Sequence, residues 1–110
     1  MNAAVLDEMT EIFHLQAHYC TCFSNEKRLQ ILYLLKEGEK SVGEIAETMG
    51  LTQQNVSQHL RIMKDRGVLR SRKSGQTVYY RISNMKFIRG CEMIQEALRE
   101  ELAKHKVMVS

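Results

Sequence analysis

Polar side chains that can donate or accept hydrogen bonds are concentrated in one short segment, residues 53–61. Seven of these positions carry amide, hydroxyl, imidazole or guanidinium groups: Gln53, Gln54, Asn55, Ser57, Gln58, His59 and Arg61. Groups of this kind contact base edges in the major groove of DNA and the phosphates beside it. A helix exposed only to solvent more often carries Glu and Lys. The composition of this segment therefore predicts contact with double-stranded DNA.

Basic side chains follow directly after this segment. Seven Lys or Arg residues lie between residues 61 and 81, where Asp65 is the one acidic residue. By contrast, residues 1–24 contain three acids and no Lys or Arg. A polyanion is expected to dock where the positive charge is concentrated. A hairpin that is simply solvated would explain the charge but not its single sign.

Two histidines and a cysteine near the start could bind a metal. His14, His18 and Cys22 follow one another at intervals of four, so they would share one face of a helix. Imidazole and thiolate ligands suit a borderline metal such as zinc. Solvated or helix-capping histidines would explain the same spacing. The spacing is compatible with both interpretations.

The cysteines allow a further kind of site. Cys20 and Cys91 fall on apolar stripes, and a buried core position is the first interpretation for each. The second is a site shared across a dimer, in which Cys20 or Cys22 of one chain lies near Cys91 of the other. Three thiolates could bind As(III) or a similar soft ion such as cadmium, or two could form a disulfide. Cys20 and Cys22 face apart on a continuous helix, so they could not hold one ion by themselves.

The elements that must position the DNA-contacting groups have clear boundary signals. Ser41 followed by Glu44 is a capping box, which begins a helix. Gly50 ends that helix, and Thr52 can cap the next one over residues 53–66. The apolar positions of this second helix form one stripe toward the core, namely Val56, Leu60 and Met63.

Residues 68–82 alternate apolar and polar side chains around a Ser74-Gly75 turn, so they predict a β-hairpin. Gly67 ends the preceding helix. A helix-turn-helix over residues 41–66 followed by a β-wing over residues 68–82 is a DNA-binding layout. The residues expected to contact DNA are Thr52, Gln53, Gln54, Ser57, Gln58, His59, Arg61, Lys73, Ser74, Gly75, Gln76 and Thr77.

Amphipathic helices are predicted at both ends of the chain. One runs from about residue 6 to residue 23, and Ser24 can cap a further helix. The last begins at Asn84 and carries Phe87, Cys91, Ile94, Leu98 and Leu102 at spacings of three or four. About twenty residues make a rod near 30 Å, as long as a small domain is wide. We therefore expect residues 1–24 and 84–106 to form a homodimer interface rather than to fold back on their own domain.

Length and composition limit the alternatives. The 110 residues, 44% of them hydrophobic, are expected to form a single domain, residues 1–110. The predicted fold is mainly α with a small β-hairpin, a dimeric winged helix-turn-helix in the order α-α-α-α-β-β-α. No catalytic constellation is present at a usable spacing, so an enzyme is not expected. The absence of a long apolar run or signal peptide and the three cysteines predict a cytoplasmic protein without a membrane partner.

Three segments resemble motifs of the ArsR/SmtB-type winged-helix repressors. Residues 23–32 (FSNEKRLQIL) are similar to the signature of their second helix, residues 50–60 (GLTQQNVSQHL) to their recognition segment, and residues 75–82 (GQTVYYRI) to their wing. The resemblance extends over about residues 6–104. It implies a homodimer that binds an inverted-repeat operator and is released by a metal, metalloid, thiol oxidant or sulfur species.

The effector sites of that family are not matched. Where relatives that sense arsenic or cadmium carry Cys-x-Cys, residues 41–44 read SVGE. The positions that hold zinc between the last two helices are occupied by Asn84, Lys86, Ala97 and Glu100. The two cysteine positions of the sulfide-responsive branch are Tyr33 and Arg99. No cofactor is certain, and an inducer is expected to act through the three cysteines or the histidine face described above.

A winged-helix interaction module without sequence-specific DNA binding is the main alternative, because a fold alone does not dictate function. Such a module would be expected to carry an acidic or apolar second helix in the helix-turn-helix. The helix over residues 53–66 is instead polar and basic. A DNA-binding assay distinguishes the two functions.

Overall fold

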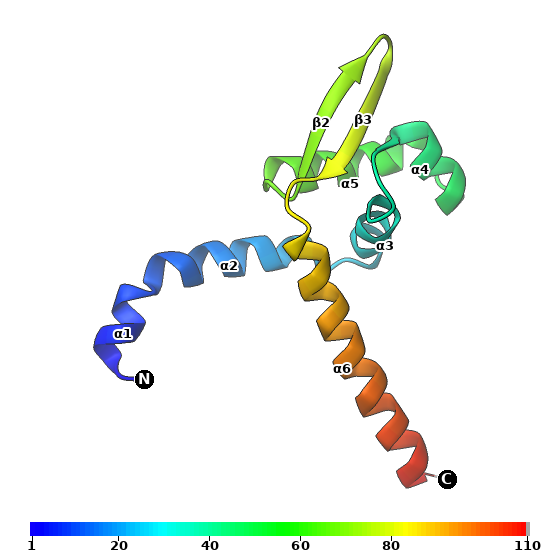
Figure 1. Ribbon diagram of the computed structural model, residues 1–110. Helices are drawn as coiled ribbons and strands as arrows, with labels where there is room; N and C mark the ends of the chain where they lie inside the picture. Colours follow the sequence, from blue (N-terminus) through cyan, green and yellow to red (C-terminus); the bar gives the residue numbers. More distant parts are fainter. Residues whose placement is uncertain (110) are drawn as a thin grey trace.

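Nine elements of secondary structure follow one another in the computed structural model, which describes residues 1–109 and their side chains as far as residue 105. The helices are α1 (Ala3–Glu8), α2 (Thr10–Cys22), α3 (Glu26–Leu35), α4 (Val42–Met49), α5 (Gln53–Asp65) and α6 (Lys86–Val109). The strands are β1 (Lys40–Ser41), β2 (Leu69–Ser74) and β3 (Thr77–Ile82). The predicted winged helix-turn-helix is confirmed (Figure 1), with one more helix and one more strand than expected.

The additional helix arises from a break in the helix predicted over residues 6–23. Met9 ends α1 and precedes α2, with φ −91° and ψ 1°. The hydroxyl of Thr10 donates to the carbonyl oxygen of Leu6 at 3.4 Å, a side-chain contact that tends to bend helices. As a result, α1 and α2 point in different directions (Figure 1).

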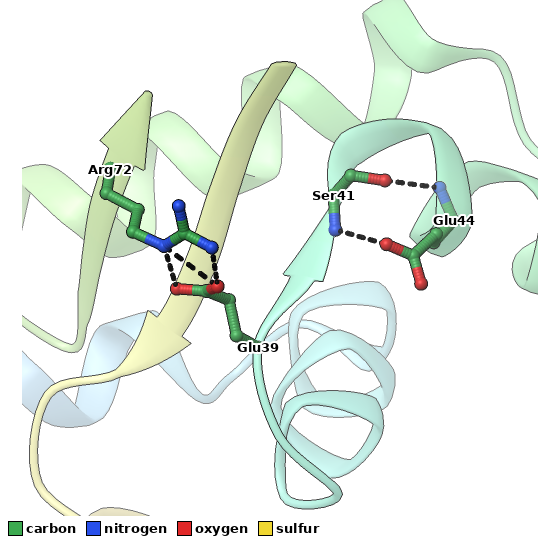
Figure 2. A network of polar contacts seen from close by, with 4 residues as sticks. All are labelled: Glu39, Ser41, Glu44 and Arg72. Atoms are coloured by element: carbon green, nitrogen blue, oxygen red, sulfur yellow. Dashed lines mark hydrogen bonds and ion pairs between the residues drawn. The ribbon is translucent and has the colours of Figure 1, made fainter. Parts of the chain in front are cut away.

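Polar caps set the limits of the helix-turn-helix as predicted. The backbone N–H of Glu44 donates to Ser41 Oγ and that of Ser41 donates to Glu44 Oε1, both at 3.1 Å (Figure 2). Gly50 closes α4 in the left-handed conformation, with φ 66°. Thr52 then accepts from the backbone N–H of Asn55 at 3.1 Å and begins α5.

The cap of α3 is one residue later than predicted. Asn25 Oδ1 accepts from the backbone N–H groups of Lys27 and Arg28 at 2.9 and 3.1 Å. The hydroxyl of Ser24 donates instead to the carbonyl oxygen of Thr21 at 2.8 Å, at the end of α2. Ser24 therefore closes the preceding helix, and the neighbouring amide side chain takes the capping position.

The sheet has three antiparallel strands in the order β1-β3-β2. Ser74 pairs with Thr77, so the turn of the wing is Gly75-Gln76 rather than the predicted Ser74-Gly75. Gly75 has φ 61°, and no residue other than glycine has a positive φ in the described part of the chain. A positive φ at the first central position alone matches a type II′ turn, which requires glycine there.

One hydrophobic core lies between α3, α4, α5 and the sheet. The predicted stripe of α5 is confirmed, since Val56, Leu60 and Met63 are all fully buried. The other large, completely buried side chains include Ile31, Leu32, Ile45, Val68, Leu69 and Ile88. Packing on this core fixes which side of α5 remains exposed.

Two arms diverge from this core (Figure 1). The pair α1 and α2 forms one arm, and α6 forms the other. The radius of gyration of the Cα atoms is 17.2 Å, whereas a compact chain of this length has about 13 Å. Asn84 Oδ1 accepts from the backbone N–H of Lys86 at 2.9 Å, and α6 continues beyond the predicted end to Val109. Its side chains Ile94, Leu98 and Leu102 are 62%, 56% and 60% exposed. Within residues 1–109, none of the helices combines the length and the apolar composition needed to span a bilayer.

Candidate nucleic-acid interface

The outer face of α5 is built around Gln54, Gln58 and Arg61. At 3.6 residues per turn these exposed side chains lie within about 60° of one another around the helix axis. The buried stripe occupies the opposite side of the same helix. Core packing therefore presents a continuous row of amide and guanidinium groups, which matches the chemistry of base edges and phosphates.

A polar cleft of about 390 Å³ lies between α5 and the wing. Gln53 and Ser57 line it from α5, while Gln76 and Thr77 line it from the wing. The first residues of α4 complete the lining. The structure thus brings together four side chains that the sequence predicted as DNA contacts, although they come from two elements.

His59 is placed differently from the other predicted contacts. It lies about 140° around α5 from Gln54 and is half-buried, with Nδ1 covered and without a hydrogen-bond partner among the described residues. Burial lowers the pKa of His59, and the charges of Arg28 and Lys27 lower it further. The imidazole is therefore neutral at pH 7, and it is less accessible to a base edge than Gln54 or Gln58.

Two of the seven basic side chains between residues 61 and 81 are engaged within the protein. Arg66 Nη1 donates to the carbonyl oxygen of His18 at 3.2 Å and to the hydroxyl of Thr21. Arg72 donates to both carboxylate oxygens of Glu39 (Figure 2). Arg72 is nevertheless exposed, and the other exposed basic side chains of this segment are Arg61, Lys64, Arg70, Lys73 and Arg81. Sequence reasoning missed this division because the partners lie 33 and 48 positions away in the chain.

Positive charge is also concentrated on the outer face of the sheet. Arg70 and Arg81 are directly opposite each other on β2 and β3, a pairing of like charges that destabilises a sheet. Glu39 offsets part of this charge. Its hydrogen bond with Arg72 lowers the pKa of Glu39, as do the charges of Arg72 and Arg81, so the carboxylate stays ionised.

An apolar groove of about 540 Å³ separates α2 from α6 and contains two of the three cysteines, Cys20 and Cys91. Its other lining includes Tyr19 and Phe87, whose rings are stacked with centroids 5.5 Å apart. Ile12 and Ile94 continue the apolar surface along the two arms. The structure therefore brings two predicted thiols to one groove within a single chain.

The three thiols differ in exposure. Cys20 is exposed, Cys22 is fully buried in the core, and Cys91 is almost covered. Burial raises the pKa of Cys91, and the neighbouring Cys20 and Cys22 raise it further. Burial also raises the pKa of Cys22, although Arg28 and Arg66 act in the opposite direction. Cys22 and Cys91 are therefore protonated at neutral pH.

The burial of Cys22 separates it from the two histidines with which it was predicted to form a metal-binding face on α2. His14 and His18 are exposed, whereas Cys22 turns into the core. In the described residues, no three His, Cys, Asp or Glu side chains are grouped so that they could hold a metal ion. The face expected from the spacing of four is consequently not assembled within one chain.

The end of α2 is tied to the end of α5. Besides the contacts of Arg66 described above, Arg28 Nε donates to the carbonyl oxygen of Cys22 at 2.8 Å. Gly67 has φ 83°, and a Cβ atom there would lie 2.9 Å from the hydroxyl of Tyr19. Through Tyr19, the groove that contains Cys20 and Cys91 is therefore in contact with Gly67, two residues beyond the end of α5.

A helix-turn-helix with a polar, exposed second helix and a basic β-wing places this protein in the class of winged helix-turn-helix proteins. The family model described as "Bacterial regulatory protein, arsR family" matches residues 25–71. The homodimeric winged helix-turn-helix DNA-binding domain Mb0332 from Mycobacterium bovis has a TM-score of 0.78 and 31% identity, covering 87% of this chain and 89% of that one. The chain belongs to the ArsR family of bacterial regulatory proteins.

Two curated relatives extend the comparison. The transcriptional activator HlyU of Vibrio cholerae is 44% identical over 61 residues, which cover 56% of each chain. The HTH-type transcriptional regulator Rv0324 of Mycobacterium tuberculosis is 34% identical over 102 residues, which cover 93% of this chain and 42% of Rv0324. The chain therefore spans about half the length of these curated relatives.

Proposed function

We propose that this protein is a DNA-binding transcriptional regulator that acts as a repressor. The observation that carries the proposal is the exposed row of Gln54, Gln58 and Arg61 on α5, next to a wing with exposed basic side chains. The row supplies donors and acceptors for base edges in a major groove, and Lys73 at the wing supplies charge for phosphates. The relatives named above are regulators of transcription, which supports the same function.

The proposed DNA-binding form is a homodimer in which the two arms of one protomer pack against those of the other. The exposed apolar side chains of α6 and the apolar groove between α2 and α6 provide the surface. Mb0332, which has the same fold, is homodimeric. A two-fold axis would place the two α5 helices in successive major grooves of an inverted repeat, about 34 to 36 Å apart.

Base and phosphate contacts can be separated by mutation. A duplex is first selected by the wild-type protein from a random-sequence library, and affinities for this operator and for random DNA are measured by fluorescence anisotropy. Gln54→Ala and Gln58→Ala should each reduce the preference for the operator by about 1 to 3 kcal/mol. Lys73→Ala should weaken binding to all duplexes alike and reduce the slope of log affinity against log salt by about one.

Lys104→Ala is the matched control, since it removes the same charge from the exposed end of α6. Equal losses on operator and random DNA for both glutamine variants would contradict the assignment of α5. Failure of the wild-type protein to enrich any sequence would favour the alternative, an interaction module without sequence-specific binding.

We further propose that release from DNA is controlled by the thiols of the α2–α6 groove. Cys20 and Cys91 line the same groove, and Cys22 lies close enough to affect the pKa of Cys91. Because no three such side chains are grouped to hold a metal within the described part of one chain, three thiols would have to meet across the dimer. Arsenous acid suits an apolar site of this kind, because each thiol passes its proton to a departing water and the arsenic trithiolate is neutral. No charge is then left in an apolar groove, whereas a cadmium trithiolate would carry one.

The thiol proposal is tested by measuring DNA release with arsenite, cadmium, peroxide and a persulfide donor. Cys91→Ser should keep DNA binding and lose the response, while His14→Ala should keep both. The coupling free energy between inducer binding and operator binding needs to be about 1 to 3 kcal/mol. Operator DNA must then weaken inducer binding by the same factor as the inducer weakens operator binding. If a variant with all three cysteines changed to serine still releases DNA normally, the thiols are packing residues and the inducer acts elsewhere.

A further inference from the structure

Arg72 makes contacts that cross all three strands of the sheet. The strands lie in the order β1-β3-β2, and Arg72 is on β2. Its guanidinium carbon lies 4.7 Å from the centre of the Tyr79 ring on β3. Beyond that ring it reaches Glu39, which directly precedes β1 (Figure 2). The three residues Glu39, Arg72 and Tyr79 are called the wing strap below.

The geometry of the strap is that of a directional contact rather than a loose surface ion pair. Arg72 Nε lies 2.9 Å from both carboxylate oxygens of Glu39, and Nη2 lies 2.6 Å from Oε1. Paired N–H donors in a fixed plane specify orientation as well as attraction. The ring of Tyr79 supports the guanidinium from below through its negative face. Lysine could supply the charge but not this arrangement.

The strap is located where the wing meets the helix-turn-helix. Glu39 precedes Ser41 by two residues, and Ser41 both pairs with Tyr79 and begins α4 through the capping box. The helix α4 in turn packs against α5. The position of the wing relative to the row on α5 therefore depends on the same short segment, residues 39–41.

On this basis we infer that Glu39 and Arg72 are positioning residues that hold the wing at a fixed angle to α5, while the adjacent Lys73 makes the phosphate contact. The inference rests on the proposed DNA-binding function. Arg72 directs its Nε–H and an N–H of Nη2 at the carboxylate of Glu39. To present this edge of the guanidinium to a phosphate it would have to leave Glu39 as an unpaired negative charge close to DNA, which opposes binding.

The test compares neighbouring basic residues of the wing. Arg72→Ala and Glu39→Gln should each reduce the ratio of operator affinity to random-DNA affinity by up to about tenfold, as expected for one directional ion pair with a cation–π contact. Arg72→Ala should leave the salt dependence of random-DNA binding unchanged. Lys73→Ala, the matched control, should reduce that salt slope by about one.

Two further variants distinguish positioning from general loss of structure. The double variant Glu39→Gln/Arg72→Ala should lose no more specificity than either single variant, because both break one contact. Arg72→Lys, which keeps the charge and is accommodated at an exposed site, should behave as Arg72→Ala. Melting temperatures of all variants confirm that they are folded.

Three results would overturn the inference: a salt slope that falls in Arg72→Ala as it does in Lys73→Ala, additive losses in the double variant, or an unchanged affinity ratio in all strap variants. Each of these requires wild-type binding to the operator. If the wild-type protein does not bind the operator, the proposed function itself is refuted, and the inferred role of the wing strap in DNA binding is refuted with it.

Discussion

The helix-turn-helix with its wing and the two arms differ in what stabilises them. In residues 25–83, each helix begins at a side-chain cap, and the apolar stripes meet in one core. In α2 and α6, large apolar side chains such as Phe13, Ile94 and Leu98 stay exposed. The first region satisfies its own hydrophobic surface within one chain. The second is an amphipathic structure whose apolar face needs a partner.

The stabilities of the two regions should therefore depend differently on protein concentration. The stability of a region that packs on itself is a property of one chain, so it does not change with dilution. The stability gained by covering the arms with a second copy follows mass action and increases with protein concentration. Mutations in the two regions should therefore be distinguishable by dilution alone.

The largest effect is expected from Leu98→Glu, which places a charge on the apolar face of α6. Wild-type protein should sediment as a dimer at micromolar concentration, and the variant as a monomer near 12.8 kDa. Loss of the second half-site contact should reduce operator affinity by about 10² to 10⁴. Ala103→Glu, about 140° around the helix from Leu98, adds the same charge and should remain dimeric. If the wild-type protein is a monomer at these concentrations, the arms are stable without a partner and do not differ from the helix-turn-helix in this respect.

Leu60→Ala should produce the next largest effect, in the opposite region. The side chain is fully buried in α5, and its truncation leaves a cavity that costs about 2 to 5 kcal/mol. Urea unfolding should give this loss in the wild-type background at every protein concentration, and the same loss in the Leu98→Glu monomer background. A loss that grew on dilution would mean that the core itself depends on the dimer.

A smaller effect is expected when the capping box is broken. Ser41→Ala removes the acceptor for the backbone N–H of Glu44 and should lower the free energy of unfolding by about 1 kcal/mol. Ser74→Ala, at the exposed tip of the wing, serves as the control. Equal melting temperatures of the two variants would indicate that α4 is held by packing alone.

The smallest effect concerns pH. Burial and the charges of Arg28 and Lys27 lower the pKa of His59 in the folded protein below its ordinary value of 6.5. The folded state therefore disfavours the imidazolium, so stability is complete above pH 6.5 and decreases as the pH falls from there through the lowered pKa. His59→Gln should flatten this part of the profile, measured by urea unfolding, whereas His14→Gln, at an exposed site, should not.

Local signals predicted the helix-turn-helix closely. The capping box at Ser41, the left-handed Gly50 and the cap at Thr52 depend on neighbours within four residues, so the sequence contains all the information they need. The buried stripe of α5 follows from periodicity for the same reason. The prediction for α2 was less accurate, because a bend at Met9 leaves no Gly or Pro as a signal.

The candidate site was predicted only in part. The polar row on α5 follows from the buried stripe, but the engagement of Arg66 and Arg72 depends on partners distant in sequence. A similar limit applies to His59, whose pKa is lowered by burial and by the charges of Arg28 and Lys27 on α3. The burial of Cys22 was not predicted for the same reason, since it depends on how α2 packs against the core.

The contact between Tyr19 and Gly67 places the start of α6 beside the end of α5, so we infer that α6 would rotate about its start. Tyr19 stacks on Phe87, the second residue of α6, and its hydroxyl lies against Gly67. At about 1.5 Å per residue, Cys91 lies about 8 Å from the start of α6 and Leu102 about 24 Å from it. A displacement of about 1 Å turns the helix by about 8° at Cys91 but by about 2° at Leu102. A bond formed at Cys91, as in the proposed response to an inducer, would therefore act close to this point, where the smallest displacement gives the largest rotation.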